Sequence, residues 1–473
     1  MKKSILSIVL ILLSTFSFAQ VRFGPRYEQV KTLEDVDFDV IAMAEHGALI
    51  VQEEEGTSTE YSLILRHLNT DLELQWEESV GIYEPVSVHA FRHSENVAYI
   101  LLHNKYDFNY QLIRADVSTG EVQKFNSFKI QDFVLGFFEV IQDRFIFGGS
   151  YLGKPSVLIH DHETNEFNII PDVYPKGTVL AEIKVNDDGV TFNVLASELD
   201  RKLDRTISVH TYDYEGNSIR DYTLGVKPGY RLINGRISSI HDISQTIVGQ
   251  YTLGNKEEVA GVYVNHINRS GLQTMVYHNF DSLPNFLKQM GEKRAGNYRN
   301  KALHLARQGK EKTYRGRVFP GRIVEADGKL LLTMVCFVYK GPLTHVYTLV
   351  LNEQGEIEWG DYLARNETQG AWKSWASSFQ WLGSGKGAHM AYFREKLSVK
   401  LLDGSGENEV RTASLPLKSP LYELKDEEEK TQRVINWYDG QFLVYGLQQV
   451  RPKDKSDILR TVFYINKVKV TGK

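Results

Sequence analysis

One short pattern recurs along the chain and constrains its fold more than any other feature. "LIRADVSTGEVQKF" (Leu112–Phe125) and "LIHDHETNEFNII" (Leu158–Ile170) both contain an apolar run, a polar turn and a second run. Matching Thr119 with Thr164 gives an offset of 45 residues. Asp, Asn and Gly adopt the left-handed backbone of tight turns, and Asp and Asn side chains also bond to that backbone. Each copy therefore predicts a β-hairpin.

The pattern returns at five further places, which are Ile207–Leu224, Val262–Tyr277, Tyr347–Leu363 and, more loosely, Leu63–Trp76 and Leu397–Leu415. A second hairpin precedes such copies, as in "VNDDGVTFNVLAS" and "VEADGKLLLTMV". Each unit thus predicts four short antiparallel strands, and four-stranded units at this spacing are typical of β-propeller blades. We predict an all-β protein, a β-propeller of eight four-stranded blades, with seven blades as the alternative.

The two ends of the chain are expected to meet. The last unit ends on the strand Thr461–Val470 and lacks an outer strand, which "YEQVKTLE" (Tyr27–Glu34) is able to supply. Pairing these ends would close the ring and remove its open edges. We therefore expect one propeller domain over residues 20–473.

The outer turns of the units resemble those of quinoprotein-like and WD40-like propellers, whose turn reads roughly Asp-x-x-Thr-Gly-x-x-x-Trp. Asp116, Thr119 and Gly120 match this turn, whereas Lys124 stands in the place of the tryptophan, which Trp359 supplies in another copy. The resemblance implies a fold only. Quinone-dependent members use adjacent cysteines, which this chain lacks, so no cofactor is carried over.

Residues 1–19 have the features of a secretory signal peptide. Lys2 and Lys3 precede the apolar run "SILSIVLILLSTFSF", and Ser17 and Ala19 occupy the −3 and −1 positions of a cleavage site. No later segment has about 18 uninterrupted apolar residues, so we expect no membrane span. We expect a monomer exported to the periplasm or the medium, and not a lipoprotein, because no cysteine lies near the cleavage point.

Composition narrows the chemistry further. The only cysteine, Cys336, lies in an apolar run, so an internal disulfide and a multi-thiolate metal site are both excluded. The net charge of −5 gives no overall attraction to nucleic acid. We predict no cofactor, no metal and no nucleic-acid partner.

The stretch "FGGSYLGKPSVLIHDHE" (Phe147–Glu163) carries two misleading motifs. Gly148, Gly153 and Lys154 are spaced as in a phosphate-binding loop, but Pro155 replaces the required Ser or Thr and a strand follows. His160 and His162 are able to begin a zinc site, but closing that site needs a third ligand from elsewhere in the chain. We expect a loop between two strands and a solvated turn.

Three other short motifs also have simple structural interpretations. "NDDG" (Asn186–Gly189) predicts a hairpin turn rather than a calcium loop. Trp372, Trp375 and Trp381 lie close together in "AWKSWASSFQWLG", where they either stack on sugars or, as we favour, fill the space between blades. The "KDEEEK" run (Lys425–Lys430) predicts a solvated loop.

An insertion interrupts the pattern between two blades, over residues 281–317. The spacing between turns rises to 84 residues from Gly271 to Gly355. Leu283, Phe286, Leu287 and Met290 have helical spacing, and a second periodic run follows up to Gly309, so a pair of helices is predicted. From Lys288 to Arg317 there are ten Lys or Arg and two Glu. Two interpretations stay open: a solvated basic face, which we favour, or contacts to a polyanion through Lys293, Arg294, Arg299, Lys301 and Arg307.

The sequence has the pattern of a complete scaffold but no catalytic motif. We therefore favour an exported, non-enzymatic propeller that binds a protein or a cell-envelope component such as a glycan. The alternative is a propeller hydrolase or lyase acting on glycan or peptide, with its catalytic residues scattered over blade loops.

Overall fold

The computed structural model describes residues 20–473 apart from several short gaps. The gaps are 33–34, 56–60, 83–86, 105–108, 143, 171–176, 200–204, 241–243, 255–257, 327, 339–342, 368–378, 382–386, 394–396, 407–410, 413–421, 425–432, 453–458 and 472–473. The expected signal peptide, Trp372, Trp375 and the "KDEEEK" run lie outside the described residues.

The described residues form eight antiparallel sheets. Sheet 1 contains β2 (Asp35–Ala42), β3 (Ala48–Glu55), β4 (Tyr61–Leu68) and β5 (Leu74–Ile82). Sheet 2 contains β6 (Ser87–Ser94), β7 (Val97–Asn104), β8 (Asn109–Asp116), β9 (Val122–Lys124) and β10 (Phe128–Lys129). Sheet 3 contains β11 (Phe133–Ile141), β12 (Arg144–Tyr151), β13 (Lys154–Asp161) and β14 (Glu166–Ile169). Sheet 4 contains β15 (Val179–Val185), β16 (Thr191–Leu199), β17 (Arg205–Asp213) and β18 (Ser218–Thr223).

The second half of the chain follows the same plan. Sheet 5 contains β19 (Tyr230–Ile237), β20 (Gln245–Leu253), β21 (Val259–Ile267) and β22 (Gln273–Asn279). Sheet 6 contains β23 (Gly316–Ala326), β24 (Lys329–Val338), β25 (Leu343–Asn352) and β26 (Ile357–Glu367). Sheet 7 contains β27 (Phe379–Trp381), β28 (Ala388–Phe393), β29 (Leu397–Leu402) and β30 (Arg411–Thr412). Sheet 8 contains β31 (Tyr422–Leu424), β32 (Arg433–Asn436), β33 (Gln441–Pro452), β34 (Arg460–Thr471) and β1 (Gln20–Val30).

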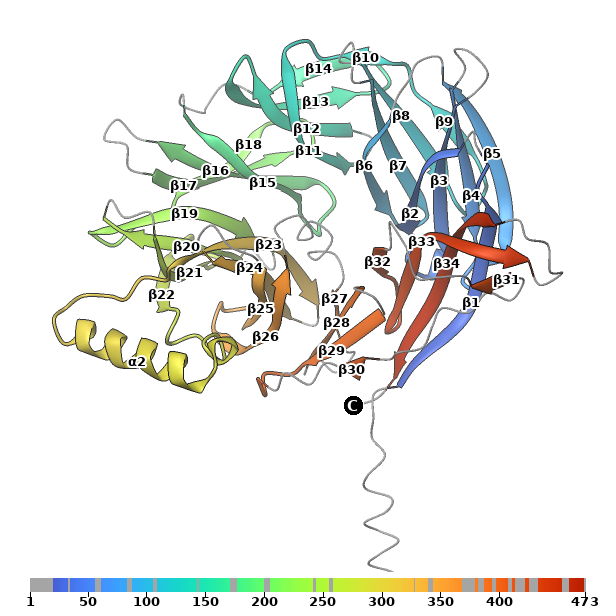
Figure 1. The fold of residues 1–473 in the computed structure, drawn as a ribbon. Helices are drawn as coiled ribbons and strands as arrows, with labels where there is room; N and C mark the ends of the chain where they lie inside the picture. The colour runs from blue at the N-terminus through green and yellow to red at the C-terminus, as the bar shows by residue number, and fades with distance from the viewer. Residues whose placement is uncertain are drawn as a thin grey trace, which may run out of the picture.

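The sheets are arranged around a common centre, with the first strands β11, β15, β19 and β23 on the inside (Figure 1). Because each sheet runs up and down, its first-to-second and third-to-fourth strand turns lie on one face of the ring, here called the turn face. The second-to-third turns and the links between sheets lie on the opposite face, the connection face. This arrangement confirms the predicted β-propeller, whereas the number of blades in the ring stays a prediction.

The first strand of the chain completes the last sheet. β1 pairs antiparallel with β34, with Tyr27 opposite Ile465 and Val30 opposite Val462. The predicted outer strand is thus present, although it begins at Gln20 and ends at Val30, before the predicted end at Glu34. This pairing leaves β34 with a partner on each side.

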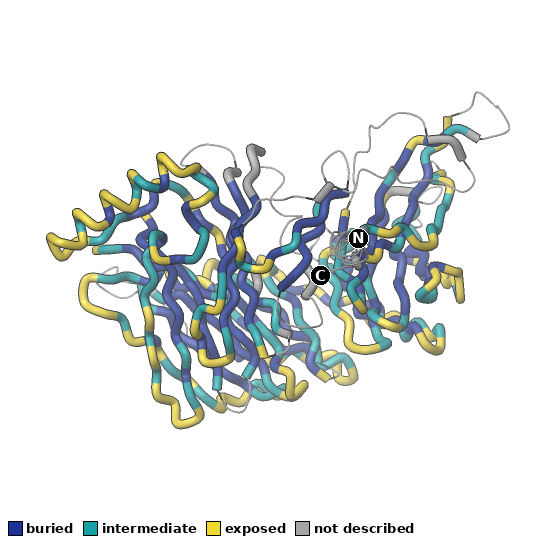
Figure 2. The backbone as a smooth tube through the Cα atoms, turned by 90° about the horizontal axis from the view of Figure 1, so that it is seen from below, coloured by how far each residue is buried: buried dark blue, intermediate teal, exposed yellow. Residues whose placement is uncertain are grey.

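Buried apolar clusters join each sheet to the next. Separate clusters connect sheets 1 and 2, 2 and 3, 3 and 4, 4 and 5, 5 and 6, 6 and 7, and 7 and 8. A further cluster connects sheet 8 to sheet 1, where the rings of Phe38 and Phe463 stack with centroids 4.4 Å apart. The buried strands and exposed turns are separated clearly in Figure 2. The core is therefore divided into layers between sheets.

The stretch that resembles a phosphate loop is part of a hairpin in sheet 3. Gly148 lies inside β12, and a turn at Leu152 and Gly153 leads directly into β13. A Cβ atom at Gly148 would lie 2.2 Å from Ile183 Cδ1 of sheet 4, so a larger residue there would displace that side chain. The predicted loop between strands is confirmed, although it is shorter than expected.

The solvated turn predicted around His160 is wrong. His160 is only 1 % exposed, and its ring lies 4.6 Å from both Phe128 and Phe167. Its Nε2 lies 3.0 Å from Asn165 Oδ1, and burial lowers the pKa of the imidazole. His160 is therefore an aromatic core residue, while His162 contacts Phe125 nearer the surface.

The insertion contains one α-helix rather than two. The segment predicted as the first helix forms turns and the 3-10 helix η2 (Lys288–Met290); another 3-10 helix, η1, spans Ala44–His46. α2 (Glu292–Ala306) is the α-helix. The apolar residues Leu283, Phe286 and Leu287 nevertheless lie buried between sheets 5 and 6. No helix in the described ranges is long and apolar enough to cross a membrane.

A fully buried ion pair joins sheets 6 and 7. Lys400 Nζ of β29 lies 3.2 Å from Asp361 Oδ1 of β26, and neither side chain is exposed. Lys400 also donates a hydrogen bond to the carbonyl of Tyr362. Burial lowers the pKa of Lys400, and the Asp361 charge opposes this effect.

We expect Asp361→Ala to destabilise the protein by about 3–5 kcal/mol, because it leaves a buried ammonium without its counter-charge. The double variant Asp361→Asn/Lys400→Met should lose much less, since it removes both charges. Urea unfolding of the two variants measures the difference. Equal losses for both would contradict a role for the charge pair.

We expect His160→Ala to destabilise the protein by about 2–4 kcal/mol, because it opens a cavity among aromatic rings. His162→Ala is the matched control and should cost about 1 kcal/mol or less, the value of one aromatic contact. Thermal unfolding of the two single variants tests this order. If both variants unfold like the wild type, the packing role assigned to His160 is wrong.

Candidate functional site

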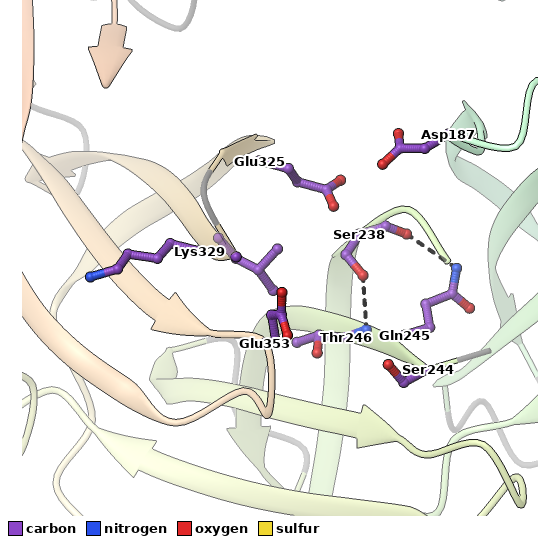
Figure 3. Close-up of a pocket in the computed structure, with 10 residues that line it drawn as sticks. Asp187, Ser238, Ser244, Gln245, Thr246, Glu325, Lys329 and Glu353 are labelled. Atoms are coloured by element: carbon purple, nitrogen blue, oxygen red, sulfur yellow. Dashed lines mark hydrogen bonds between the residues drawn. The ribbon is translucent and has the colours of Figure 1, made fainter. Parts of the chain in front are cut away.

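A pocket of about 270 Å³ lies on the turn face, where sheets 4, 5 and 6 meet. Asp187 comes from the β15–β16 turn, Glu325 from the end of β23 and Glu353 from the β25–β26 turn (Figure 3). The other lining residues are Ser238, Ser244, Gln245, Thr246, Gly328, Lys329 and Leu330. Nearly all of these side chains are polar.

The floor of the pocket is a set of buried, hydrogen-bonded polar groups. Ser238 Oγ accepts a hydrogen bond from Thr246 N at 2.9 Å, and Gln245 Nε2 donates to the carbonyl of Ser238 at 3.1 Å. Ser238, Gln245 and Thr246 are each 1–2 % exposed. Because these groups are held by one another, the floor is preorganised.

Glu325 connects the three sheets at the pocket. Its carboxylate forms an ion pair with Lys184 of β15 and accepts a hydrogen bond from Ser239 N at 2.8 Å. Ser239 Oγ in turn donates to Asp187 Oδ1 at 2.9 Å. This series of polar contacts, which runs from sheet 4 through sheet 5 to sheet 6, therefore fixes the positions of two pocket carboxylates.

The charge inside the pocket is negative. The carboxylates of Asp187 and Glu325 point toward the space between them, whereas the Lys329 ammonium points away (Figure 3). Lys329 Nζ instead pairs with Glu358 Oε2 at 2.6 Å. Glu353 has no hydrogen bond or ion pair to the described residues. A Cβ at Gly328 would lie 2.8 Å from Glu353 Oε1, so glycine leaves room for this carboxylate.

Only one motif in the sequence marks this pocket. "NDDG" forms the predicted hairpin turn, in which Asp188 Oδ1 accepts hydrogen bonds from Val190 N and Thr191 N at 2.9 Å. The same turn directs the neighbouring Asp187 to the pocket. Ser238 and Glu325 carry no local motif, and sequence reasoning missed them.

A serine, a histidine and an aspartate form a hydrogen-bonded chain in sheet 4. His210 Nδ1 lies 2.8 Å from Asp221 Oδ1, and its Nε2 lies 3.1 Å from Ser208 Oγ. The Ser208 hydroxyl donates to Glu198, so its proton does not face the imidazole. Ser208 is also only 2 % exposed, whereas a nucleophile must reach its substrate.

The five cations predicted to contact a polyanion all lie on or just after α2. Lys293, Arg294, Arg299, Lys301 and Arg307 are all exposed. They lie on the connection face, since α2 links β22 to β23, and are therefore separate from the pocket (Figures 1 and 2). The structure thus presents two distinct surfaces, one acidic and one basic.

Among the described residues, no group of three or more His, Cys, Asp or Glu side chains is arranged to hold a metal ion. Cys336 is buried in β24, and burial raises the pKa of its thiol. Its position is that of a core residue in the cluster between sheets 5 and 6.

No family model matches the chain, and no curated protein matches it. Among solved structures, the chain is similar to the polysaccharide lyase Uly1, with 12 % identity, a TM-score of 0.43, and 80 % of this chain and 89 % of that chain covered. It is also similar to the β-propeller domain of the Trilobed protease from Pyrococcus furiosus, with 12 % identity, a TM-score of 0.38, and coverage of 84 % and 100 %.

A third similar structure is one of two prolyl endopeptidases, with 10 % identity and a TM-score of 0.43. That match covers 89 % of this chain and 54 % of the endopeptidase, so the chain spans about half of that protein's length. At such identities the likeness concerns the fold alone, and the assignment of the fold rests on the sheet topology. The resemblance to quinoprotein-like or WD40-like blades stays a prediction.

Proposed function

We propose that this protein is an exported, non-enzymatic β-propeller that binds a saccharide unit of a cell-envelope glycan in the pocket on the turn face. The observation that carries the proposal is the lining of the pocket. It combines carboxylates, hydroxyls and an amide around about 270 Å³. Pockets for small ligands begin at roughly 300 Å³, so the space suits a single sugar-sized unit.

The hydrogen-bonding capacity of the pocket matches the hydroxyl groups of a sugar. Carboxylates accept but do not donate, so Asp187, Glu325 and Glu353 suit a ligand that brings several O–H donors. Hydrogen bonds to charged acceptors are stronger than neutral ones and would orient the ring. The buried hydroxyls of Ser238 and Thr246 add acceptors deeper in the pocket.

The second candidate function is hydrolysis or lysis of a glycan or peptide. One observation favours it: Asp187 and Glu325 face each other across the pocket, as the carboxylates of glycosidases do (Figure 3). Several similar structures also bear the names of a lyase or of peptidases. Glu325, however, is already engaged by Lys184 and Ser239. Binding is therefore the function that we favour.

The Ser208–His210–Asp221 chain does not strengthen the enzymatic alternative. Burial lowers the pKa of His210, but its interactions with Glu198 and Asp221 outweigh this effect and raise the pKa above its usual value. A raised pKa favours the imidazolium form, and an imidazolium is unable to take a proton from a serine. We interpret this hydrogen-bonded group as a charged link between β16, β17 and β18.

We expect Asp187→Asn/Glu353→Gln to weaken saccharide binding by about 10-fold or more, because each change weakens a charge-assisted hydrogen bond. Calorimetric titration with glucose, galactose, N-acetylglucosamine and their oligosaccharides measures the loss. Glu121→Gln, an exposed carboxylate in sheet 2, is the matched control and should bind like the wild type.

The saccharide titration also separates the two candidate functions. Failure of every saccharide to bind at millimolar concentration, or unchanged binding by the double variant, would overturn the proposal. Release of new reducing ends or unsaturated products by the wild type, but not by Asp187→Asn or Glu325→Gln, would favour the enzymatic alternative.

We expect the His210 link to stabilise the protein most below pH 6.5. A pKa raised in the folded state gives stability that is fully present below the unfolded-state value of 6.5 and is lost as pH rises through the folded value. Urea unfolding from pH 5.5 to 8.5 should show wild type losing stability relative to His210→Gln. A pH-independent difference between the two proteins would contradict a charged His210.

A further inference from the structure

The segment around α2 carries a set of exposed cations. Eight Lys and Arg residues make up this set, and their side chains form no hydrogen bond or ion pair with the part of the chain that the structure describes. They are Lys293, Arg294, Arg299, Lys301, Arg307, Lys310, Arg315 and Arg317. The outer side of α2 is visible as exposed tube in Figure 2.

Many cations elsewhere in the structure form ion pairs that join strands or sheets. Arg92 of β6 pairs with Glu139 of β11 at 2.7 Å, and Arg433 of β32 pairs with Asp39 of β2. Lys184 of β15 pairs with Glu325 of β23. Those cations connect neighbouring parts of the ring, whereas the eight cations around α2 form no such ion pair with the described residues.

The insertion is anchored to the propeller by other residues. Before α2, Asn285 Nδ2 donates to the carbonyls of Gly360 and Gly404 at 2.9 and 2.7 Å. After α2, Glu311 accepts hydrogen bonds from Tyr230 and from Tyr251, the latter at 3.1 Å. The helix is thus fixed at both ends, and its cations are presented on a rigid support.

The inner side of α2 supplies the contact with the propeller. Ala295 and Ala302 are buried, and Tyr298 packs against the cluster between sheets 5 and 6. Since successive helix residues are rotated by about 100°, Arg299 lies on one flank of the exposed side and Arg294 on the other. The cations therefore extend along and around a rod of about 22 Å, the length of 15 helical residues.

We propose that the outer side of α2 and the segment that follows it bind a linear acidic polysaccharide. Residues Lys288–Arg317 sum to +8, so the rest of the chain sums to −13 (−5 minus 8). An anionic polymer is therefore repelled by the remaining surface and attracted to this one place. This site is independent of the saccharide pocket, which lies on the opposite face.

The shape of the basic surface favours a polymer over a lipid bilayer. A helix that lies in a membrane interface needs an apolar face directed at the lipid. The apolar side of α2 is packed on the propeller, and Leu303 is the only exposed large apolar side chain of the helix. A flexible chain is able to contact both flanks, whereas a flat bilayer meets one side only.

The composition of the surface also favours a polysaccharide over a nucleic acid. Proteins that bind single strands combine cations with exposed aromatic rings on which bases stack. The exposed side of α2 has no Phe, Tyr or Trp, and the ring of Tyr298 lies beneath the Lys312 ammonium at 4.9 Å. Sulfate or carboxylate groups along a glycan need only the cations.

The test uses the full chain and size-fractionated heparin and alginate as sulfated and carboxylated probes. The main variant replaces Lys293, Arg294, Arg299, Lys301 and Arg307 with Gln. We expect its affinity for both probes to fall by about 100-fold at 50 mM NaCl, and the slope of log Kd against log salt to decrease by about one for each cation that contacts an anion. Lys293→Gln/Arg294→Gln should give an intermediate loss.

A control with the same change in net charge replaces five exposed cations elsewhere, namely Arg22, Lys129, Lys154, Arg269 and Arg460. It should retain wild-type binding, and so should the pocket variant Asp187→Asn/Glu353→Gln. Circular dichroism and thermal unfolding confirm that each variant is folded, since the replaced side chains of α2 have no partner in the described chain.

Three results would overturn the proposal. The first is no binding of heparin or alginate at 50 mM NaCl, and the second is an equal loss of binding in the α2 variant and the control. The third is tighter binding to phosphatidylglycerol vesicles or to DNA than to either polysaccharide. Loss of saccharide binding at the pocket with retained heparin binding would contradict the proposed function alone.

Discussion

The pairing of β1 with β34 is the interaction on which the rest of the structure depends. A ring of sheets buries all of its apolar faces only if its last member meets its first, as sheet 8 meets sheet 1 here. β1 supplies the fourth strand of the last sheet, and Arg26 fixes it there with hydrogen bonds to Asn466 at 2.8 Å and Gln448 at 2.6 Å. The Arg26 guanidinium also lies 4.3 Å from the ring centre of Tyr464. Closure thus combines backbone pairing with a largely buried cation.

Closure of the ring also determines where a functional site is able to form. Once every sheet face is covered by a neighbour, the turns at the two faces of the ring are the parts left to form binding sites. On the turn face, short hairpins from sheets 4, 5 and 6 converge and form the pocket around Glu325. On the connection face, the longer link between β22 and β23 has room for α2. The two candidate sites therefore arise from the two kinds of connection that the fold requires.

The sequence predicted the features that depend on short-range patterns. Turn residues such as Asp116 and Gly120 mark hairpins by local chemistry, and the missing outer strand of the last unit predicted the role of Tyr27–Val30. The pocket was out of reach, because Asp187, Ser238 and Glu325 are brought together only by the contact of three sheets. Contacts of this range leave no periodic signal in the sequence.

Two sequence-based predictions, the first helix of the insertion and the solvated His160, fail for the same physical reason. The helical spacing of apolar residues such as Leu283 and Phe286 predicts a helix, but turns that fold over a core bury side chains at similar intervals. His160 was placed in solvent because it precedes a turn, but the end of β13 is covered by rings from sheet 2 and from β14. In both cases packing between sheets, which the sequence pattern does not record, decided the environment of the residue.

The opposite charges of the two surfaces favour ligands of different chemistry at each. The pocket on the turn face is lined by three carboxylates, while the connection face carries the cations of α2, which have no partner among the described residues. Under the two proposals, an acidic polymer binds at α2 and is repelled from the pocket, so the two ligands do not compete for one surface. A protein bound to an acidic polysaccharide through α2 would direct its pocket away from that polymer. Under the two proposals, the ring therefore acts as a rigid spacer that connects an acidic glycan on one face to a second, hydroxyl-rich ligand on the other.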